Sequence, residues 1–456
     1  MKTHPLALIN GQYIDFRQGS QDSTNLLLQN GQVIGHGYMP DDGVDRQTLV
    51  YDIKGCIIVP GIIDTSVHIR EPGEEDKETV ASVSAAAIAG GITGIVSSPD
   101  TTPSPDNPEM IAALLRKGTQ VGQTPIYPIG CLSKGRSGQN LAEMGLMRDA
   151  GALAFSDLNS IQDSGLMEQA MRYAKALDCP VIVSPDEPTL HRGGVMNSSA
   201  SAIQKGLKGI PAHAEELRLS RDIQLAACTG VHLHVFPVST AGAVAMIRDA
   251  KAKKIHVTCG TAPHYLYFSD SDIGDYDTQY KVMPPFRSKA DQEALLEGIK
   301  DGTIDCIASH HHPMTVDEKR TDFISAGFGI SGIDTFVPAV IHKLVHDCEL
   351  SIVEACRLIS QKPREIFKLP KMTAGLLKRP SFTVIHPKKE THVNADTFIS
   401  RGKNSPFIGQ TFQSRVMMTV IDGHIVYQDP ELTAVPASEV SLENTGYPTA
   451  EAPPHV

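Results

Sequence analysis

Residues 56–73 read CIIVPGIIDTSVHIREPG, an apolar run that passes into a polar segment. The run is rich in Ile and is bounded by Pro, Gly and Asp, which predicts a buried strand. Side chains two apart on a strand lie on the same face, so a strand that ends in His-x-His can hold one metal ion. In this chain Ser66 takes the first of those positions and His68 the second. The stretch therefore predicts a core strand that ends with only one of the two histidines of such a metal site.

Seven more runs rich in Val and Ile follow, and segments with helical periodicity lie between them. Strands that alternate with helices pair in parallel, and eight such units close into a barrel. The predicted fold class is therefore α/β, with a (β/α)8 TIM-type barrel over residues 58–368. A doubly wound open sheet is the alternative, but no G-x-G-x-x-G or Walker sequence follows any of these strands. The predicted strands cover residues 56–64, 92–99, 125–132, 152–157, 180–185, 232–238, 254–260 and 304–310, and the predicted helices cover 77–91, 107–118, 165–178, 212–230, 241–253 and 289–302.

The two flanks of this region have a different pattern. They hold short runs that alternate or turn on Asn-Gly, which is typical of antiparallel strands. Neither flank alone has enough strands for a stable sheet. We therefore expect one small composite β-sandwich built from both chain ends, residues 1–57 and 369–430. Residues 431–456 are Pro-rich, acidic and weakly periodic, which predicts a C-terminal tail or docking arm.

Composition narrows the function classes. The chain has 456 residues, 41% of them hydrophobic, enough for a large core. A net charge of -11 argues against nucleic acid or an anionic membrane as the main partner. The first residues lack the long apolar stretch of a signal peptide or spanning helix, so we expect a cytoplasmic location. The eight cysteines are scattered without a C-x-x-C pair, which favours buried reduced thiols.

Barrel enzymes carry their chemistry at the carboxyl ends of the strands. Three histidines follow one another at the end of the last predicted strand. Consecutive residues of an extended segment point to opposite faces, so only the first and the third could bind the same ion. We interpret the three histidines as a loop at the rim of the barrel. The candidate residues at the strand ends are Ser66, His68 and Arg70, then Asp100, Asp157, Ser184 and Pro237, and last His310, His311 and His312.

Several longer motifs carry a family resemblance. In order they are HIREPG, GGITGIV, LAFSD, GGVMN, VSTAGAV, PPFRSKADQEAL, FGISGIDT and KNSPFIGQTF, spread over residues 68–412. With them the chain resembles the dihydroorotases of the amidohydrolase superfamily, and most of all the non-catalytic dihydroorotase-like subunits that some bacteria pair with aspartate transcarbamoylase.

The resemblance implies a zinc site made of His-x-His, a bridging carboxylate, two single histidines and an aspartate. Only two of the corresponding positions keep a suitable residue type, because a serine hydroxyl is a feeble zinc ligand and proline has no donor side chain. We therefore expect no metal, no cofactor and no catalytic residue. The six vestigial metal-site positions are Ser66, His68, Asp157, Ser184, Pro237 and His310.

The resemblance also implies a substrate site in which an arginine and two asparagines contact the substrate. Arg70 survives, but Asp100 and Met283 stand where the family has asparagine. An anion at Asp100 repels an incoming carboxylate and can pair with Arg70 instead. These three residues are vestigial substrate-site positions on this interpretation.

The preferred hypothesis is a non-catalytic structural subunit that assembles with the aspartate transcarbamoylase catalytic chain, in a large hetero-oligomer such as a dodecamer, in de novo pyrimidine biosynthesis. The alternative is an active amidohydrolase, a dihydroorotase or related cyclic-ureide hydrolase, with an altered or mononuclear metal site that uses His68, Asp157 and the histidine run. A third hypothesis is a sensor that binds a pyrimidine intermediate through Arg70 without converting it.

Overall fold

The barrel is formed by an eight-stranded parallel sheet. The computed structural model describes residues 5–36, 48–121, 123–159, 161–370 and 379–436. The strand order is β15-β14-β13-β10-β9-β8-β7-β6, and all eight predicted strands are confirmed. The sheet closes where the N–H of His68 donates to the carbonyl of His311, at 2.9 Å, beside a parallel bridge between Val67 and His311. The strands are β6 (Ile62–Val67), β7 (Ile92–Ser97), β8 (Ile126–Gly130), β9 (Ala154–Phe155), β10 (Val181–Val183), β13 (Leu233–Val235), β14 (Val257–Thr261) and β15 (Cys306–Ile307).

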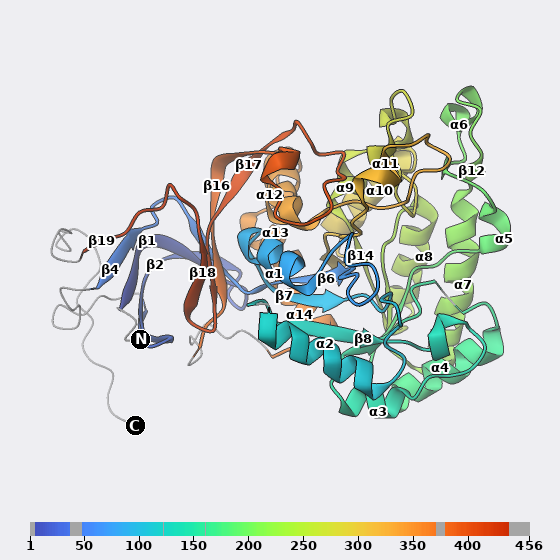
Figure 1. Ribbon diagram of the computed structural model, residues 1–456, viewed down its shortest axis with the longest axis horizontal. Helices are drawn as coiled ribbons and strands as arrows, with labels where there is room; N and C mark the ends of the chain where they lie inside the picture. The colour runs from blue at the N-terminus through green and yellow to red at the C-terminus, as the bar shows by residue number, and fades with distance from the viewer. Residues whose placement is uncertain (1–4, 37–47, 122, 160, 371–378, 437–456) are drawn as a thin grey trace.

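Helices surround this sheet on its outside (Figure 1). The six predicted helices are confirmed as α1 (Val80–Ala89), α2 (Pro108–Val121), α4 (Ser164–Ala176), α7 (Ala212–Thr229), α8 (Ala241–Ala252) and α10 (Lys289–Lys300). Shorter helices complete the ring and the loops: α3 (Met144–Asp149), α5 (Pro188–His191), α6 (Ala200–Gln204), α9 (Pro263–Tyr267), α11 (Val316–Lys319), α12 (Phe336–Ile341), α13 (Ile352–Ile359) and α14 (Gln361–Ile366).

The opening stretch of the sequence divides between two sheets. β5 (Ile57–Pro60) pairs with strands of the terminal domain, whereas β6 belongs to the barrel. Gly61 separates them at a close approach: a Cβ there would lie 2.6 Å from Arg364 Nη2 and 2.7 Å from Thr93 Oγ1. The single strand predicted over 56–64 is therefore two strands.

Both chain ends contribute to a nine-stranded sheet, as predicted for the composite β-sandwich. Its main path is β18-β17-β16-β5-β1-β2-β3, and β4 joins β1 to β19. Figure 1 shows this sheet beside the barrel. The strands are β1 (Leu6–Asp15), β2 (Ser20–Gln29), β3 (Gln32–His36), β4 (Leu49–Asp52), β16 (Phe382–His392), β17 (Thr411–Ile421), β18 (His424–Gln428) and β19 (Val435–Pro436), and β11 (Met196–Asn197) pairs apart with β12 (Gly209–Ile210).

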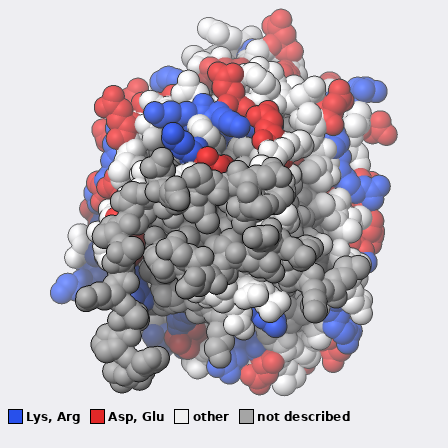
Figure 2. Space-filling view, turned by 90° about the vertical axis from the view of Figure 1, so that its left-hand side faces the viewer, with Lys and Arg blue, Asp and Glu red and all other residues white. Residues whose placement is uncertain are grey.

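The face of the molecule at the end of the terminal domain carries mixed charge. On the described part of the face at this end, Lys and Arg side chains intermingle with Asp and Glu (Figure 2). No described helix is long and apolar enough to cross a membrane. The tail predicted over 431–456 lies outside the described residues from 437 onward. The domain boundaries stay predictions.

Candidate active site

A cavity of about 120 Å³ opens inside the carboxyl ends of the barrel strands. Seven residues named as candidates from the sequence line it: Ser66, His68, Ser184, Pro237, Met283, His310 and His312. The remaining lining residues are Thr65, Ser98, Ile129, Ser156, Leu158, Asn159, Ile182 and Phe236. The wall is thus made mostly of hydroxyl, imidazole and apolar groups.

Strained backbone surrounds this cavity. Arg70, Leu158 and His310 are not glycines, yet their φ angles are +66°, +64° and +53°. They follow β6, β9 and β15, whose carboxyl ends form the mouth of the barrel. Left-handed backbone at a residue other than glycine costs about 1–3 kcal/mol and is concentrated at functional sites. The strain favours a site whose side chains are held in fixed directions.

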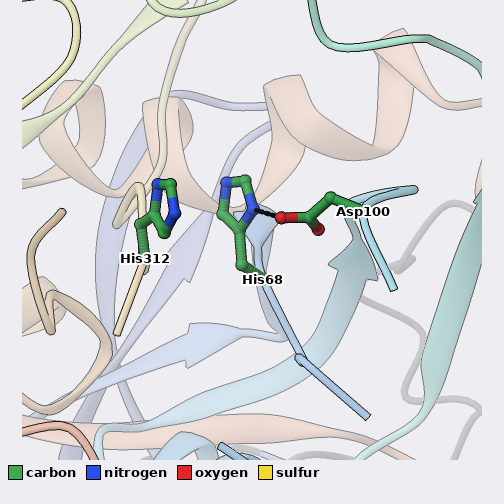
Figure 3. A group of neighbouring side chains, drawn as sticks. All are labelled: His68, Asp100 and His312. Atoms are coloured by element: carbon green, nitrogen blue, oxygen red, sulfur yellow. Dashed lines mark hydrogen bonds and ion pairs between the residues drawn. The ribbon is translucent and has the colours of Figure 1, made fainter. Parts of the chain in front are cut away.

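Three side chains from distant parts of the chain meet at this mouth: His68, Asp100 and His312 (Figure 3). One ligand atom of each lies within 4.8 Å of the others. His68 Nδ1 lies 2.5 Å from Asp100 Oδ2, and the rings of His68 and His312 stack with centroids 4.3 Å apart. The extended ends of β6, β7 and β15 bring these residues together.

Charge in the cluster is set by burial and pairing. Burial lowers the pKa of His68, although the Asp100 carboxylate opposes the shift. Burial alone would raise the pKa of Asp100, but His68 and Arg70 hold it well below its usual range. An ionised Asp100 accepts a hydrogen bond from the N–H at Nδ1 of the neutral His68 ring, and an ion shared by the two residues would take the place of that proton.

These residues fit a divalent metal ion. Asp100 Oδ1 is buried without a hydrogen-bond partner among the described residues, so one carboxylate oxygen remains available. Two imidazoles and a carboxylate are the three-ligand set of many catalytic zinc sites. The expectation that the zinc site is lost and that the chain has no cofactor is therefore wrong, because a set of possible metal ligands exists. Two of these ligands, Asp100 and His312, are not metal ligands that the resemblance implies.

The metal positions implied by the resemblance are occupied differently. Ser66, Ser184 and Pro237 line the cavity without a strong metal ligand. Asp157 instead accepts hydrogen bonds from the N–H groups of Leu132 (2.8 Å) and Ser133 (3.1 Å) and from the Ser133 hydroxyl. Burial raises the pKa of Asp157, and the bonds from Ser133 oppose this. Asp157 therefore caps the turn after β8.

The histidine run is built into the mouth and is not the rim loop expected from the sequence. His311 is fully buried, with its Nε2 3.1 Å from Glu78. His310 faces the cavity, and its ring stacks 5.5 Å from that of His264. Burial lowers the pKa of His310 well below its usual value. His312 joins the cluster, so the three neighbours have three different surroundings.

Other predicted residues have clear structural partners. Arg70 Nη1 donates to Asp100 Oδ2 and to Glu74 Oε2, each at 2.9 Å, while Met283 lines the cavity. His264 follows a strand in the sequence, but nothing in its spacing signals the stacking on His310.

Comparison with known proteins finds relatives along nearly the whole chain. A family model described as Dihydro-orotase-like matches residues 55–242. A protein named dihydroorotase from Syntrophus aciditrophicus is 39% identical over 93% of this chain and 99% of its own length. One of the same name from Pelobacter propionicus is 38% identical, with the same coverage of 93% and 99%.

Solved structures share the fold. The L-hydantoinase (dihydropyrimidinase) from Arthrobacter aurescens superposes with a TM-score of 0.82 at 22% identity, over 94% of this chain and 97% of that one. The dihydropyrimidinase from Brevibacillus agri gives 0.80 at 20% identity, over 95% and 97%. The relatives that match nearly the whole chain are named as enzymes. The expectation that this chain has no catalytic activity is therefore wrong.

Proposed function

The chain belongs to the dihydroorotase-like family of amidohydrolases of pyrimidine metabolism, and on that basis we propose that it hydrolyses a cyclic amide bond in a ureide ring at the barrel mouth. The observation that carries the proposal is the cluster of His68, Asp100 and His312 beside the cavity. The proposal corresponds to the alternative above, an amidohydrolase with an altered metal site.

Each part of the site has a chemical task. His68, Asp100 and His312 would hold a divalent cation, which when bound supplies Lewis-acid activation of an amide carbonyl or of water. His310 Nδ1 is buried without a partner among the described residues, and burial favours the neutral ring, which can orient an attacking water and take up its proton. The hydroxyl groups of the wall can donate to ring carbonyls and accept from ring N–H groups. Apolar side chains of the lining such as Ile129 and Phe236 give these contacts less polar surroundings, which strengthens them.

The metal prediction is tested on purified full-length protein loaded with zinc. We expect close to one ion per chain, and His68→Ala or His312→Ala to weaken zinc binding by roughly 100-fold because each removes one of three ligands. His191→Ala is the matched control, since His191 pairs with Asp186 in another loop. Metal content by mass spectrometry and zinc titration are the readouts. Full occupancy in the cluster variants would contradict the assigned ligands.

Activity is measured on the same preparations with dihydroorotate, dihydrouracil and hydantoin. We expect ring opening that depends on zinc and falls by roughly 100-fold or more in His310→Gln, which removes the proton acceptor. Absence of turnover for every ring by the zinc-loaded protein would refute the proposed function.

Association with the aspartate transcarbamoylase catalytic chain is a separate proposal that rests on the family resemblance alone. Co-expression with that chain followed by size-exclusion chromatography tests it. Separate elution of the two chains at micromolar concentration would count against it.

A further inference from the structure

A second pocket lies between α11 and residues 395–408 and shares no lining residue with the cavity at the barrel mouth. Its volume of about 370 Å³ falls within the roughly 300–1,000 Å³ of typical small-molecule sites. Lys319, Arg320 and Lys403 line it, and its described lining residues include no aspartate or glutamate. The pocket is therefore cationic in a chain whose net charge is -11, and such a cleft attracts anions.

The guanidinium of Arg320 has no partner within the described part of the protein. Its side chain is exposed and makes no hydrogen bond or ion pair with any described residue. The backbone of Arg320 is nevertheless fixed at the end of α11, because its N–H donates to the carbonyl of Val316 at 2.8 Å. A guanidinium can donate two parallel hydrogen bonds to one phosphate or carboxylate group. Arg320 is thus free to bind an anion.

The two lysines of the pocket keep donors to spare. Lys319 Nζ donates to the carbonyls of Thr278 at 2.9 Å and Lys281 at 3.0 Å, and Lys403 Nζ likewise donates to two backbone carbonyls. An ammonium group has three N–H donors, so each lysine retains one for a ligand. Burial lowers the pKa of Lys319 to about 7, which leaves Arg320 and Lys403 as the cations of this pocket that are fully charged at neutral pH.

Asn404 adds an unpaired donor to the pocket lining. Its Oδ1 accepts from the N–H of Met314 at 3.0 Å and from the Ser331 hydroxyl at 2.9 Å, which fixes the orientation of the amide. Nδ2 is buried without a partner among the described residues, and the side chain is 4% exposed. A buried donor without a partner costs about 1–3 kcal/mol. An acceptor oxygen of a ligand would remove this cost.

The carboxylates that act on Lys319 are held by other groups. Asp277 Oδ1 accepts from the N–H of Gln279 at 2.9 Å, and Glu318 Oε1 lies 2.9 Å from Lys77 Nζ. Neither acidic residue lines the pocket. An anion in the pocket would therefore face mainly donors and positive charge.

The remaining wall is suited to an organic group. Met314, Val316 and Ile408 line it, and the last two side chains are 52% and 41% exposed. A phosphate monoester carries about -1.5 to -2 charges at pH 7 and three strong acceptor oxygens. These match the three cationic side chains and the Asn404 amide better than the two oxygens of a carboxylate. We propose that this pocket binds a small phosphate ester, with its phosphate at Arg320, Lys403 and Asn404. This site is separate from the hydrolysis proposed at the barrel mouth, and either can fail without the other.

Calorimetry on the full chain tests the site. The protein is freed of metal, so that phosphate cannot bind zinc at the barrel mouth, and the probes are phenyl phosphate, inorganic phosphate and phenol. We expect phenyl phosphate to bind once per chain, inorganic phosphate to bind roughly tenfold more weakly, and phenol not to bind measurably. No binding of phenyl phosphate at millimolar concentration would overturn the inference. Inorganic phosphate or phenol that binds as tightly as the ester would overturn it as well.

Variants of Arg320 test the assigned residues. We expect Arg320→Gln to weaken phenyl phosphate binding at least roughly tenfold and Arg320→Glu to abolish it, because the charge is removed and then reversed. Neither should change the urea midpoint of unfolding, since the guanidinium has no partner among the described residues.

Arg116→Gln is the matched control. Arg116 is also exposed and without a described partner, but it lies on α2 and does not line the pocket. We expect its affinity for phenyl phosphate to equal that of the unmodified chain. Unchanged affinity in both Arg320 variants, or an equal loss in Arg116→Gln and Arg320→Gln, would refute the assignment of the ligand to this pocket.

Discussion

Asp64 is an acidic residue that is completely buried in the barrel. It lies on β6 with no exposed surface, and its Oδ1 accepts from the N–H groups of Ser309 at 3.0 Å and Ser66 at 3.3 Å. Burial raises the pKa of Asp64 to about 6, although the hydrogen bonds from Ser309 oppose the shift. The ionised form is therefore less stable in the folded chain than in water.

This shift predicts a pH dependence of stability. Because the folded pKa lies above the unfolded one, protonated Asp64 stabilises the fold at low pH, and this contribution is lost as the pH rises through about 6. Asp64→Asn cannot ionise, so its free energy of unfolding relative to the unmodified chain should rise by about 1 kcal/mol between about pH 5 and about pH 7.5.

Urea unfolding at several pH values measures this difference. Asp149→Asn, which changes a side chain that is 69% exposed, is the control and should give a flat difference. A flat difference for Asp64→Asn as well would show that burial does not perturb Asp64.

Single residues also mark the limit of what the sequence predicts about the site. His68 can be identified because it follows a strand in a known spacing. From the sequence, Asp100 is identified only as a position where a substrate-binding asparagine of the family is replaced. His312 is identified only as part of a loop at the rim of the barrel. Their meeting depends on barrel closure, which joins β6 to β15 across more than half of the chain. The spacing of these residues along the sequence does not indicate that they lie close together in the folded chain.

Gly91 connects helix and strand at the scale of elements. It lies between α1 and β7 with φ +82°, and a Cβ there would lie 2.8 Å from Thr383 Cγ2 and 3.1 Å from Val416 Cγ2. Its carbonyl accepts from the Thr383 hydroxyl at 2.6 Å. The barrel and the strands β16 and β17 therefore meet at a position that has room only for glycine.

Gly91→Ala should lower the free energy of unfolding by about 2–4 kcal/mol, since it combines a left-handed backbone with overpacking. Gly19→Ala separates the two costs, because Gly19 has φ +68° but a Cβ there would have no neighbouring atom within 4 Å. We expect this control to lose only about 1 kcal/mol in chemical denaturation. Equal losses in the two variants would show that packing at Gly91 contributes nothing.

The whole fold is more predictable than the site. The alternation of strands and helices is repeated eight times, so an error in one segment leaves the barrel prediction intact. The change from the terminal sheet to the barrel at Gly61 could not be predicted from the sequence, because β5 and the first residues of β6 are both buried and apolar. Only the three-dimensional arrangement decides which sheet each of them joins.

One hydrophobic cluster extends from the barrel into the terminal domain, and a second cluster lies within the terminal domain. Ile385 and Val416 of the terminal sheet belong to the same buried cluster as Ile95 of the barrel. The Thr419 hydroxyl donates to the carbonyl of Ile88 at 2.6 Å. Apolar contact and buried hydrogen bonds that cross a domain boundary favour cooperative unfolding, whereas weakly packed domains unfold separately.

The last prediction concerns this cooperativity. Phe382 on β16 is 2% exposed and packs with Leu8 and Tyr13 of the opposite chain end. Phe382→Ala should cost about 3–5 kcal/mol through the cavity that it leaves. Because β16 contributes Phe382 to the cluster of the terminal domain and Ile385 to the cluster that extends into the barrel, hydrogen exchange in barrel strand β14 and in sheet strand β1 should lose protection at the same, lowered urea concentration. Leu49→Ala, at a side chain that is 39% exposed, should move both midpoints little. A barrel midpoint that stays fixed while that of β1 falls would mean that the two parts unfold independently.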